Sequence, residues 1–133
     1  MNIQVISEYF YPDSFRINEI VCTLTTAGHA VQVLTALPDY TTGHIPVRYK
    51  HFKNRRELCC GAPTIRIPAT ERRTGTMRRM LNYFTFMVNA SIYAIFCKCP
   101  HCDVIFVYET SPIFQALPAL ILKKRTKKKV VLY

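Results

Sequence analysis

The sequence is poor in glycine, with four residues among 133. No G-x-G-x-x-G follows its first strand-like run, and the turn at that point is aromatic and contains a proline instead. A dinucleotide-binding domain needs those glycines because its backbone must approach the pyrophosphate closely. The sequence therefore argues against dinucleotide binding.

Acidic residues are also scarce: eight Asp and Glu stand against 18 Lys and Arg, which gives a net charge of +10. Nucleic acid, an anionic membrane and a phosphorylated ligand all suit such a charge, and an ordinary solvated surface is the alternative. No recognised nucleic-acid-binding motif accompanies the charge, so we expect no nucleic-acid partner. The basic residues fall in three runs, at 50–56, 72–79 and 123–129.

No Pro/Gly/Ser-rich linker and no internal repeat divides the chain, and half of its residues are apolar. We therefore expect one folded domain over residues 1–133. The N-terminus lacks the basic, apolar and small-residue parts of a signal peptide, which predicts a cytoplasmic protein. Thiols stay reduced in that compartment, so we expect the six cysteines to be free: Cys22, Cys59, Cys60, Cys97, Cys99 and Cys102.

Segment 97–102 contains enough potential zinc ligands to require a decision: Cys97, Cys99, His101 and Cys102. Structural zinc sites usually pair two separated C-x2-C-like knuckles. The cysteines that could form a second knuckle are Cys59 and Cys60, and adjacent cysteines chelate one ion poorly. We therefore expect no metal, and a loop with incidental thiols in its place.

The first 35 residues read as strand, helix and strand. Residues 3–7 form an apolar run typical of a strand buried on both faces, and residues 30–35 form a second such run. Asp13 or Ser14 is placed to cap the helix between them, and Gly28 to end it. Four apolar residues share one face of that helix: Ile17, Ile20, Val21 and Leu24.

The same alternation continues to residue 133. Further strands are expected at 58–60, 64–68, 104–108 and 129–133, and further helices at 76–98 and 111–124. Pro118 lies inside the last helix, which predicts either a kink or a later helix start. The pattern predicts an α/β fold, a Rossmann-like, open, mostly parallel sheet with helices on both faces. Ligands bind such sheets beyond the carboxyl ends of the strands, which nominates the loops at 8–14, 37–40 and 109–112.

A set of short motifs appears in order along the chain. They are Tyr9-Phe10-Tyr11-Pro12, Arg16, Asn18-Glu19, Ala27-Gly28-His29-Ala30-Val31, Leu34-Thr35-Ala36-Leu37-Pro38-Asp39-Tyr40 and Cys102-Asp103-Val104-Ile105. In this order they resemble the N-terminal domain of family 4 glycosyltransferases. The branch that builds O-antigen and colanic-acid-type surface polysaccharides is the most similar, and the similarity extends in outline over all 133 residues.

The resemblance implies the acceptor-side half of a two-domain GT-B enzyme that transfers a sugar with retention of configuration. Its partners would be a glycan or lipid-linked acceptor and a C-terminal domain that holds the nucleotide sugar and an E-x7-E motif. Neither that motif nor that domain occurs in these residues, so we expect an incomplete N-terminal domain, inactive alone, with no cofactor of its own. The alternative is a nonenzymatic, basic, membrane-associated binding module that kept the fold.

The nominated loops and the first helix supply the candidate substrate-binding residues, and no catalytic base is assigned among them. Each has a structural alternative: the aromatic side chains can fill the core, and the polar ones can bind loop amides or solvent. Arg16 and Asn18 are expected on the exposed face of the first helical turn, where phosphate or hydroxyl groups can be bound. The full set is Glu8, Tyr9, Phe10, Tyr11, Arg16, Asn18, Asp39, Tyr40, Glu109, Thr110 and Ser111.

The segment 80–97 is uncharged and about the length of a membrane span. A polar stripe crosses it, at Arg78, Asn82, Thr85 and Asn89, and favours a packed helix with a solvent- or cleft-facing polar edge. We expect peripheral attachment to an anionic membrane at the inner face of the cell membrane, with a buried helix and a true span as alternatives. The residues expected at that surface are Arg72, Arg73, Met77, Arg78, Arg79, Met80, Tyr83 and Phe84.

Overall fold

A computed structural model describes residues 1–97, 101–110 and 112–133. They build a six-stranded sheet in the order β3-β4-β2-β1-β5-β6. Neighbouring strands are parallel except β3 and β4, which are antiparallel. The strands are β1 (Asn2–Ser7), β2 (Ala30–Ala36), β3 (Arg56–Cys59), β4 (Ala62–Ile67), β5 (Val104–Tyr108) and β6 (Lys129–Leu132).

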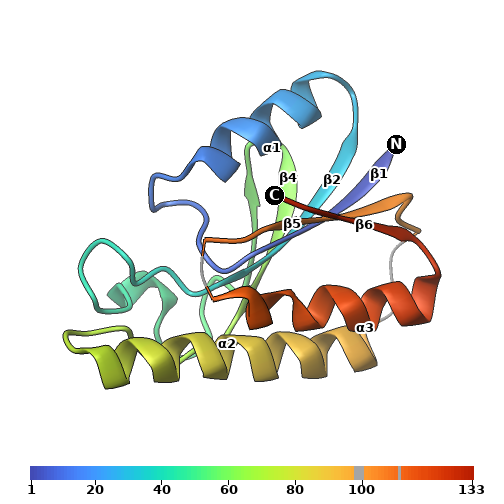
Figure 1. Cartoon of the computed structure of the whole chain (residues 1–133). Helices are drawn as coiled ribbons and strands as arrows, with labels where there is room; N and C mark the ends of the chain where they lie inside the picture. The colour runs from blue at the N-terminus through green and yellow to red at the C-terminus, as the bar shows by residue number, and fades with distance from the viewer. Residues whose placement is uncertain (98–100, 111) are drawn as a thin grey trace.

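Helices cover both faces of this sheet, as Figure 1 shows. Helix α1 lies on one face, and α2 and α3 lie side by side on the other. Two short 3-10 helices, η1 and η2, stand in the loops. The bounds are α1 (Arg16–Thr26), η1 (Val47–Tyr49), α2 (Thr76–Phe96), η2 (Ile113–Ala116) and α3 (Leu117–Thr126). The predicted fold class, an open and mostly parallel α/β sheet, is confirmed.

Successive residues of the central strands enter different cores. Val5 packs with Ile17 and Val21 of α1, whereas its neighbour Ile6 packs with Phe86 of α2. Adjacent side chains of a strand point to opposite faces, so a strand covered on both sides must be apolar at every position. The continuous apolar runs seen in the sequence follow from this arrangement.

Helix α1 begins differently from the prediction. Its N-cap is Phe15, which makes no side-chain capping hydrogen bond among the described residues, so neither Asp13 nor Ser14 caps it. Asp13 is used elsewhere, because its carboxylate accepts hydrogen bonds from the backbone N–H groups of Tyr40 and Thr41, at 3.3 and 3.2 Å. The carboxylate therefore ties the loop after β1 to the loop after β2.

Two other helix boundaries follow signals in the sequence. Gly28 has a φ of +84° just beyond α1, and the N–H groups of Gly28 and His29 close back onto the last turn. This is a Schellman ending, which favours glycine at the left-handed position. Pro118 lies in the first turn of α3, where a missing N–H costs nothing. Of the two outcomes predicted for Pro118, the later helix start is correct.

The expectation of six free cysteines is wrong. Cys22 of α1 and Cys60, in the turn between β3 and β4, form a disulfide with their Cα atoms 5.1 Å apart. The side chain of Thr25 donates to the Cys60 carbonyl at 2.8 Å, so the helix and the turn are already in contact. The sequence alone could not reveal that these two positions meet.

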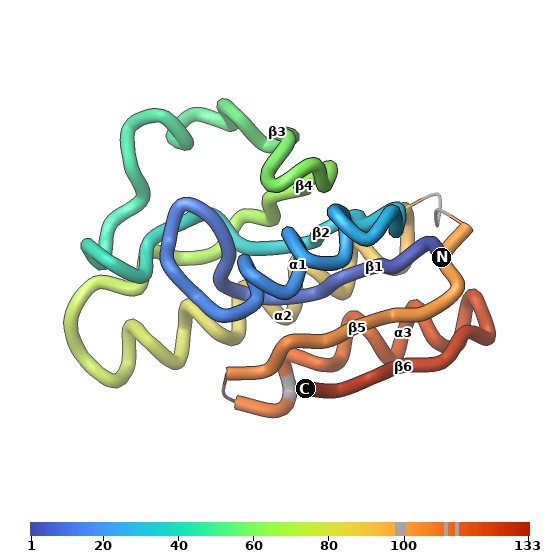
Figure 2. Tube along the Cα trace, turned by 90° about the horizontal axis from the view of Figure 1, so that it is seen from above, coloured from blue at the N-terminus to red at the C-terminus, as the bar shows by residue number. Residues whose placement is uncertain are grey.

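Strand β1 lies at the point where the strand order reverses. The chain moves from β1 to β2 and β4 on one side, then returns to β5 and β6 on the other, as seen from above in Figure 2. Ser7 pairs with Tyr108 at the ends of β1 and β5. The exit loops of these two strands therefore start side by side, at the position where open α/β sheets bind ligands.

Phe86 provides a test of the core on the α2 face. Its side chain is 0% exposed, whereas Phe84, two residues earlier on the same helix, is 54% exposed. We expect Phe86→Ala to lower the free energy of unfolding by about 3–5 kcal/mol through lost burial and a cavity. Phe84→Ala should change it by less than about 0.5 kcal/mol. Urea unfolding measures both, and equal effects would contradict the assigned face of α2.

Candidate functional site

The candidate site begins with two carboxylates at the switch point. Glu8 directly follows β1 and Glu109 directly follows β5, so they leave neighbouring parallel strands at the same edge of the sheet. Gln115 of η2 donates a hydrogen bond to Glu8 Oε2. Three of the four oxygens of these two carboxylates lack a hydrogen-bond partner among the described residues: Glu8 Oε1, Glu109 Oε1 and Glu109 Oε2. We call Glu8 and Glu109 the carboxylate pair.

Burial makes the carboxylate pair hard to ionise. It raises the pKa of Glu8 to about 8, although the Gln115 hydrogen bond acts in the opposite direction. It also raises the pKa of Glu109 to about 7. A carboxylate that leaves water loses solvation, and like charges nearby increase the cost. Near neutral pH the pair can therefore donate as well as accept hydrogen bonds.

The aromatic loop after β1 divides between core and surface. Phe10 is fully buried in the core beneath α1, and Tyr9 is buried against the rings of Phe15 and Tyr40. Tyr11 is 38% exposed and precedes Pro12 through a cis peptide bond. The structural alternative therefore holds for Tyr9 and Phe10, and Tyr11 is the member whose ring a ligand can reach.

Asp39 and Asn82 join the loop after β2 to helix α2. Asp39 Oδ2 accepts from Asn82 Nδ2 at 3.1 Å and from the backbone N–H of Arg72 at 2.7 Å. Burial raises the pKa of Asp39 to about 6. Both residues are buried, so Asp39 holds loops together, and Tyr40, which is 44% exposed, is the accessible residue of its pair.

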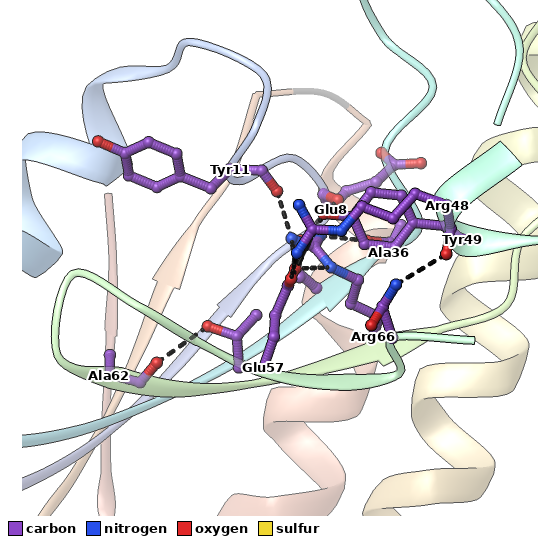
Figure 3. A network of polar contacts seen from close by, with 11 residues as sticks. Glu8, Tyr11, Ala36, Arg48, Tyr49, Glu57, Ala62 and Arg66 are labelled. Carbon is purple, nitrogen blue, oxygen red and sulfur yellow. Dashed lines mark hydrogen bonds and ion pairs between the residues drawn. The ribbon is translucent and has the colours of Figure 1, made fainter. Parts of the chain in front are cut away.

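A second network, shown in Figure 3, fixes the loop after β1 from the side of the β3-β4 hairpin. The guanidinium of Arg66 is buried beside Glu57, and Arg66 Nε donates to Glu57 Oε1 at 2.6 Å. Arg66 also donates to the carbonyl oxygens of Tyr11 and Ala36, at 2.5 and 3.4 Å. Tyr49 packs its ring against the same guanidinium, 4.8 Å from its centroid, and donates to Glu57.

The two candidates on α1 have different positions. Arg16 is exposed, as predicted. Asn18 was predicted on the same exposed face, and this is wrong: it is 6% exposed and donates to the Asp13 carbonyl at 2.8 Å. Asn18 therefore supports the preceding loop from within.

The remaining substrate candidates lie in the loop after β5. Thr110 is exposed next to the half-buried Glu109. Ser111 lies outside the described residues. The structure thus brings Glu8, Glu109 and Thr110 to one edge, while Arg16, the first residue of α1, lines a hollow with Tyr11 and Asn18.

The expected membrane-facing set requires one correction. Arg72 was predicted at the outer surface, but its side chain turns back onto the rings of Tyr9, Tyr40 and Tyr83. Tyr83 is half-buried for the same reason. The other members of the set are exposed: Arg73, Met77, Arg78, Arg79, Met80 and Phe84.

Helix α2 is oriented opposite to the prediction drawn from its polar stripe. Asn82, Thr85 and Asn89 face the body of the domain, where Thr85 accepts from the Thr70 N–H at 2.9 Å and Asn89 donates to the Pro68 carbonyl at 2.8 Å. The chain between β4 and α2 has an irregular backbone, and these side chains form hydrogen bonds with its N–H and carbonyl groups. The exposed apolar side chains of α2 lie away from this polar edge and from the buried Phe86, Ala90 and Ala94.

Two further findings concern the described residues alone. None of their helices combines the length and apolar character needed to cross a membrane. Within the same ranges, no three His, Cys, Asp or Glu side chains gather as metal ligands. Cys99 and Pro100 of the cysteine-rich segment lie outside those ranges.

Several residues of the site were not found by sequence reasoning. Gln115, Arg66 and Glu57 act through partners distant in sequence, and no local pattern marks them. Asn82 carried a signal, because a polar residue interrupted an apolar helix, but the direction in which it points was inferred wrongly.

The raised pKa of Glu8 predicts a stability that depends on pH. The folded state holds a proton on Glu8 up to about pH 8, whereas the unfolded chain releases it near pH 4.5, so stability should fall as pH rises between these values. At about pH 7 this costs the wild type about 3 kcal/mol. Urea unfolding across this range should give a flatter profile for Glu8→Gln. The exposed Glu19→Gln variant should keep the wild-type slope, and a slope unchanged in Glu8→Gln would contradict the assignment.

Comparison with known proteins bears on the fold. No protein-family model and no curated protein matches the chain. Two crystal structures of the C-terminal domain of the PF1911 hydrogenase from Pyrococcus furiosus are similar to it. One has a TM-score of 0.54 at 10% identity and covers 99% of this chain and 90% of its own. The other has a TM-score of 0.53 at 10% identity, with 98% and 89% covered. Identity this low establishes a shared α/β fold alone.

Proposed function

We propose that this domain binds a hydroxyl-rich glycan acceptor at the exit loops of β1 and β5, as the acceptor half of a retaining glycosyltransferase. The observation that supports the proposal is the carboxylate pair at the switch point of the sheet. Three of its four oxygens lack a hydrogen-bond partner among the described residues. These oxygens are buried in this structure, and a change of side-chain rotamer at the half-buried Glu109 would let sugar hydroxyls donate the hydrogen bonds that they require. The ordered motifs of the sequence support the same assignment.

Accessible aromatic rings at this edge suit a sugar ligand. Tyr11 and Tyr40 are partly exposed, at 38% and 44%, and their loops are joined through Asp13 and Arg66. An apolar ring face can cover the C–H face of a sugar while the carboxylate pair binds its hydroxyls. Rigid loops reduce the entropy lost on binding, because little must be ordered.

The proposed role of these residues is to hold the acceptor, and the nucleotide sugar would be held by a second domain. Transfer requires both substrates in one geometry, and positioning supplies up to about 7–11 kcal/mol of the barrier reduction. The 133 residues alone would therefore bind an acceptor without transferring a sugar.

The binding test uses the purified chain with neutral oligosaccharides and saturation-transfer NMR. At about pH 8.5, above the raised pKa of Glu109, Glu109→Gln should weaken binding by about tenfold, because it removes a charged hydrogen-bond acceptor. Asp103→Asn, which changes an exposed carboxylate just before β5 at the opposite edge of the sheet, should leave the affinity unchanged. Robust nucleotide-sugar turnover by the chain alone, or equal binding by both variants, would contradict the proposal.

A second candidate function, attachment to an anionic membrane, is favoured by the outward face of α2. Met77, Met80 and Phe84 are 81%, 49% and 54% exposed, and Arg78 and Arg79 lie between them. Apolar side chains flanked by arginines insert into the interface while the charges meet lipid headgroups. We propose this surface as the contact that holds the domain next to a lipid-linked acceptor.

Co-sedimentation with vesicles rich in phosphatidylglycerol tests the membrane contact. Each basic residue near such a surface is worth about 1 kcal/mol, so Arg78→Gln with Arg79→Gln should weaken binding at least about tenfold at low salt. Phe96→Ser, at the other end of α2 and 80% exposed, serves as the control. Binding to uncharged vesicles with the same affinity, or no binding at all, would remove this function.

A further inference from the structure

The side chain of Arg72 is enclosed by three tyrosines from three separate segments. Tyr9 follows β1, Tyr40 follows β2 and Tyr83 belongs to α2. Their ring centroids lie 5.4, 4.6 and 5.7 Å from the guanidinium carbon, which is within the range of cation–π contacts. We call these four residues the tyrosine box.

The charge inside the tyrosine box has no direct counter-ion, although Glu8 and Asp39 interact with it electrostatically. Among the described residues, the guanidinium of Arg72 forms no ion pair. The carboxylate of Asp39 is close, but it binds the backbone N–H of Arg72 and the side chain of Asn82 instead. Neighbouring Arg73, by contrast, is paired with Glu71 at 3.1 Å.

Most of the hydrogen-bonding capacity of Arg72 is also unused. A guanidinium has five N–H donors, and within the described residues the Arg72 side chain donates one hydrogen bond, from Nη1 to the hydroxyl of Tyr9. The rings fix the orientation of the group and displace water from it. A preorganised guanidinium of this kind is suited to bidentate binding of an oxyanion.

A purely structural role explains these observations less well. An apolar side chain would fill the space between the rings without removing a charge from water. The accessible position of Tyr40 also leaves an approach to the box from solvent. The surrounding chain is basic, which attracts anions rather than repelling them.

We propose that Arg72 binds an oxyanion carried by a sugar, either a phosphate or a carboxylate, with the ring of Tyr40 against the sugar. The inference rests on the proposed function, since the sugar is the acceptor held by the same exit loops. It adds a ligand class: the acceptor is acidic at a position adjacent to the hydroxyls that the carboxylate pair recognises. Arg72 then belongs to the substrate site and not to the membrane contact.

The test exploits the absence of tryptophan, because all protein fluorescence then comes from the eight tyrosines, three of which surround Arg72. The chain is titrated with glucose 1-phosphate, glucuronic acid, inorganic phosphate and glucose at fixed ionic strength. Arg72→Ala should weaken binding of the acidic sugars by about tenfold or more. Arg56→Ala, exposed on the edge strand β3, removes the same charge elsewhere and should change binding by less than about twofold.

Arg72→Lys separates binding from folding. It keeps the charge and the backbone hydrogen bond to Asp39 but loses the planar fork, so it should fold normally, by circular dichroism, and still bind the acidic sugars more weakly than wild type. The two acidic sugars distinguish phosphate from carboxylate as the natural group. Wild-type affinity in Arg72→Lys and Arg72→Ala, or an equal loss in Arg56→Ala, would overturn the inference.

The outcomes also separate this inference from the proposed function. If neutral oligosaccharides bind through Glu109 and acidic sugars do not bind through Arg72, the glycan-binding proposal stands and the oxyanion site is wrong. If acidic sugars bind through Arg72 and Glu109→Gln affects no sugar, the oxyanion site stands and the proposed acceptor geometry is wrong. If Arg72→Ala loses vesicle binding but keeps sugar phosphate binding, Arg72 belongs to the membrane contact and the inference is wrong.

Discussion

The parallel pairing of β1 with both β2 and β5 is the constraint on which the candidate site depends. Parallel neighbours end at the same edge, so the residues that follow them must meet there. Glu8 and Glu109 are 101 positions apart in sequence and become neighbours for this reason alone. The antiparallel hairpin of β3 and β4 then supplies Arg66 and Glu57, which fix the first loop from the side.

Helix α2 links the two surfaces of functional interest. Its polar residues form hydrogen bonds with the irregular backbone between β4 and α2. Asn82, for example, donates to the Thr70 carbonyl at 2.6 Å. Phe86, Ala90 and Ala94 also face the core, and the apolar residues on the remaining side of the helix are left outside. The same orientation turns Tyr83 toward Arg72 and leaves Met77 and Phe84 exposed. One helix thus contributes to the tyrosine box and to the proposed membrane contact.

Local sequence patterns predicted the elements and their order well. The apolar runs of β1 and β5, the glycine after α1 and the proline of α3 each reflect constraints that act within a few residues. The fold class followed from that alternation, and so did the placement of the exit loops. These predictions needed no knowledge of which distant residues touch.

Predictions about single side chains were less successful because their positions depend on tertiary contacts. Asn18 was expected in solvent and is buried, because its side chain donates to the Asp13 carbonyl of the preceding loop. Arg72 was predicted at the surface because its neighbours form a basic run. Its side chain instead packs against tyrosines from two distant loops and from α2. The Cys22–Cys60 disulfide joins residues 38 positions apart, and no local pattern specifies such a partner.

The contacts of Arg66 have a mechanical consequence. One guanidinium bonds the backbone of the loop after β1, at Tyr11, and the last residue of β2, at Ala36, while its counter-ion belongs to the edge strand β3. A displacement of the hairpin would therefore carry both attachment points with it, as a single rigid unit. The backbone position of Tyr11 is thereby coupled to the outer edge of the sheet, on the far side of β4 from the candidate site.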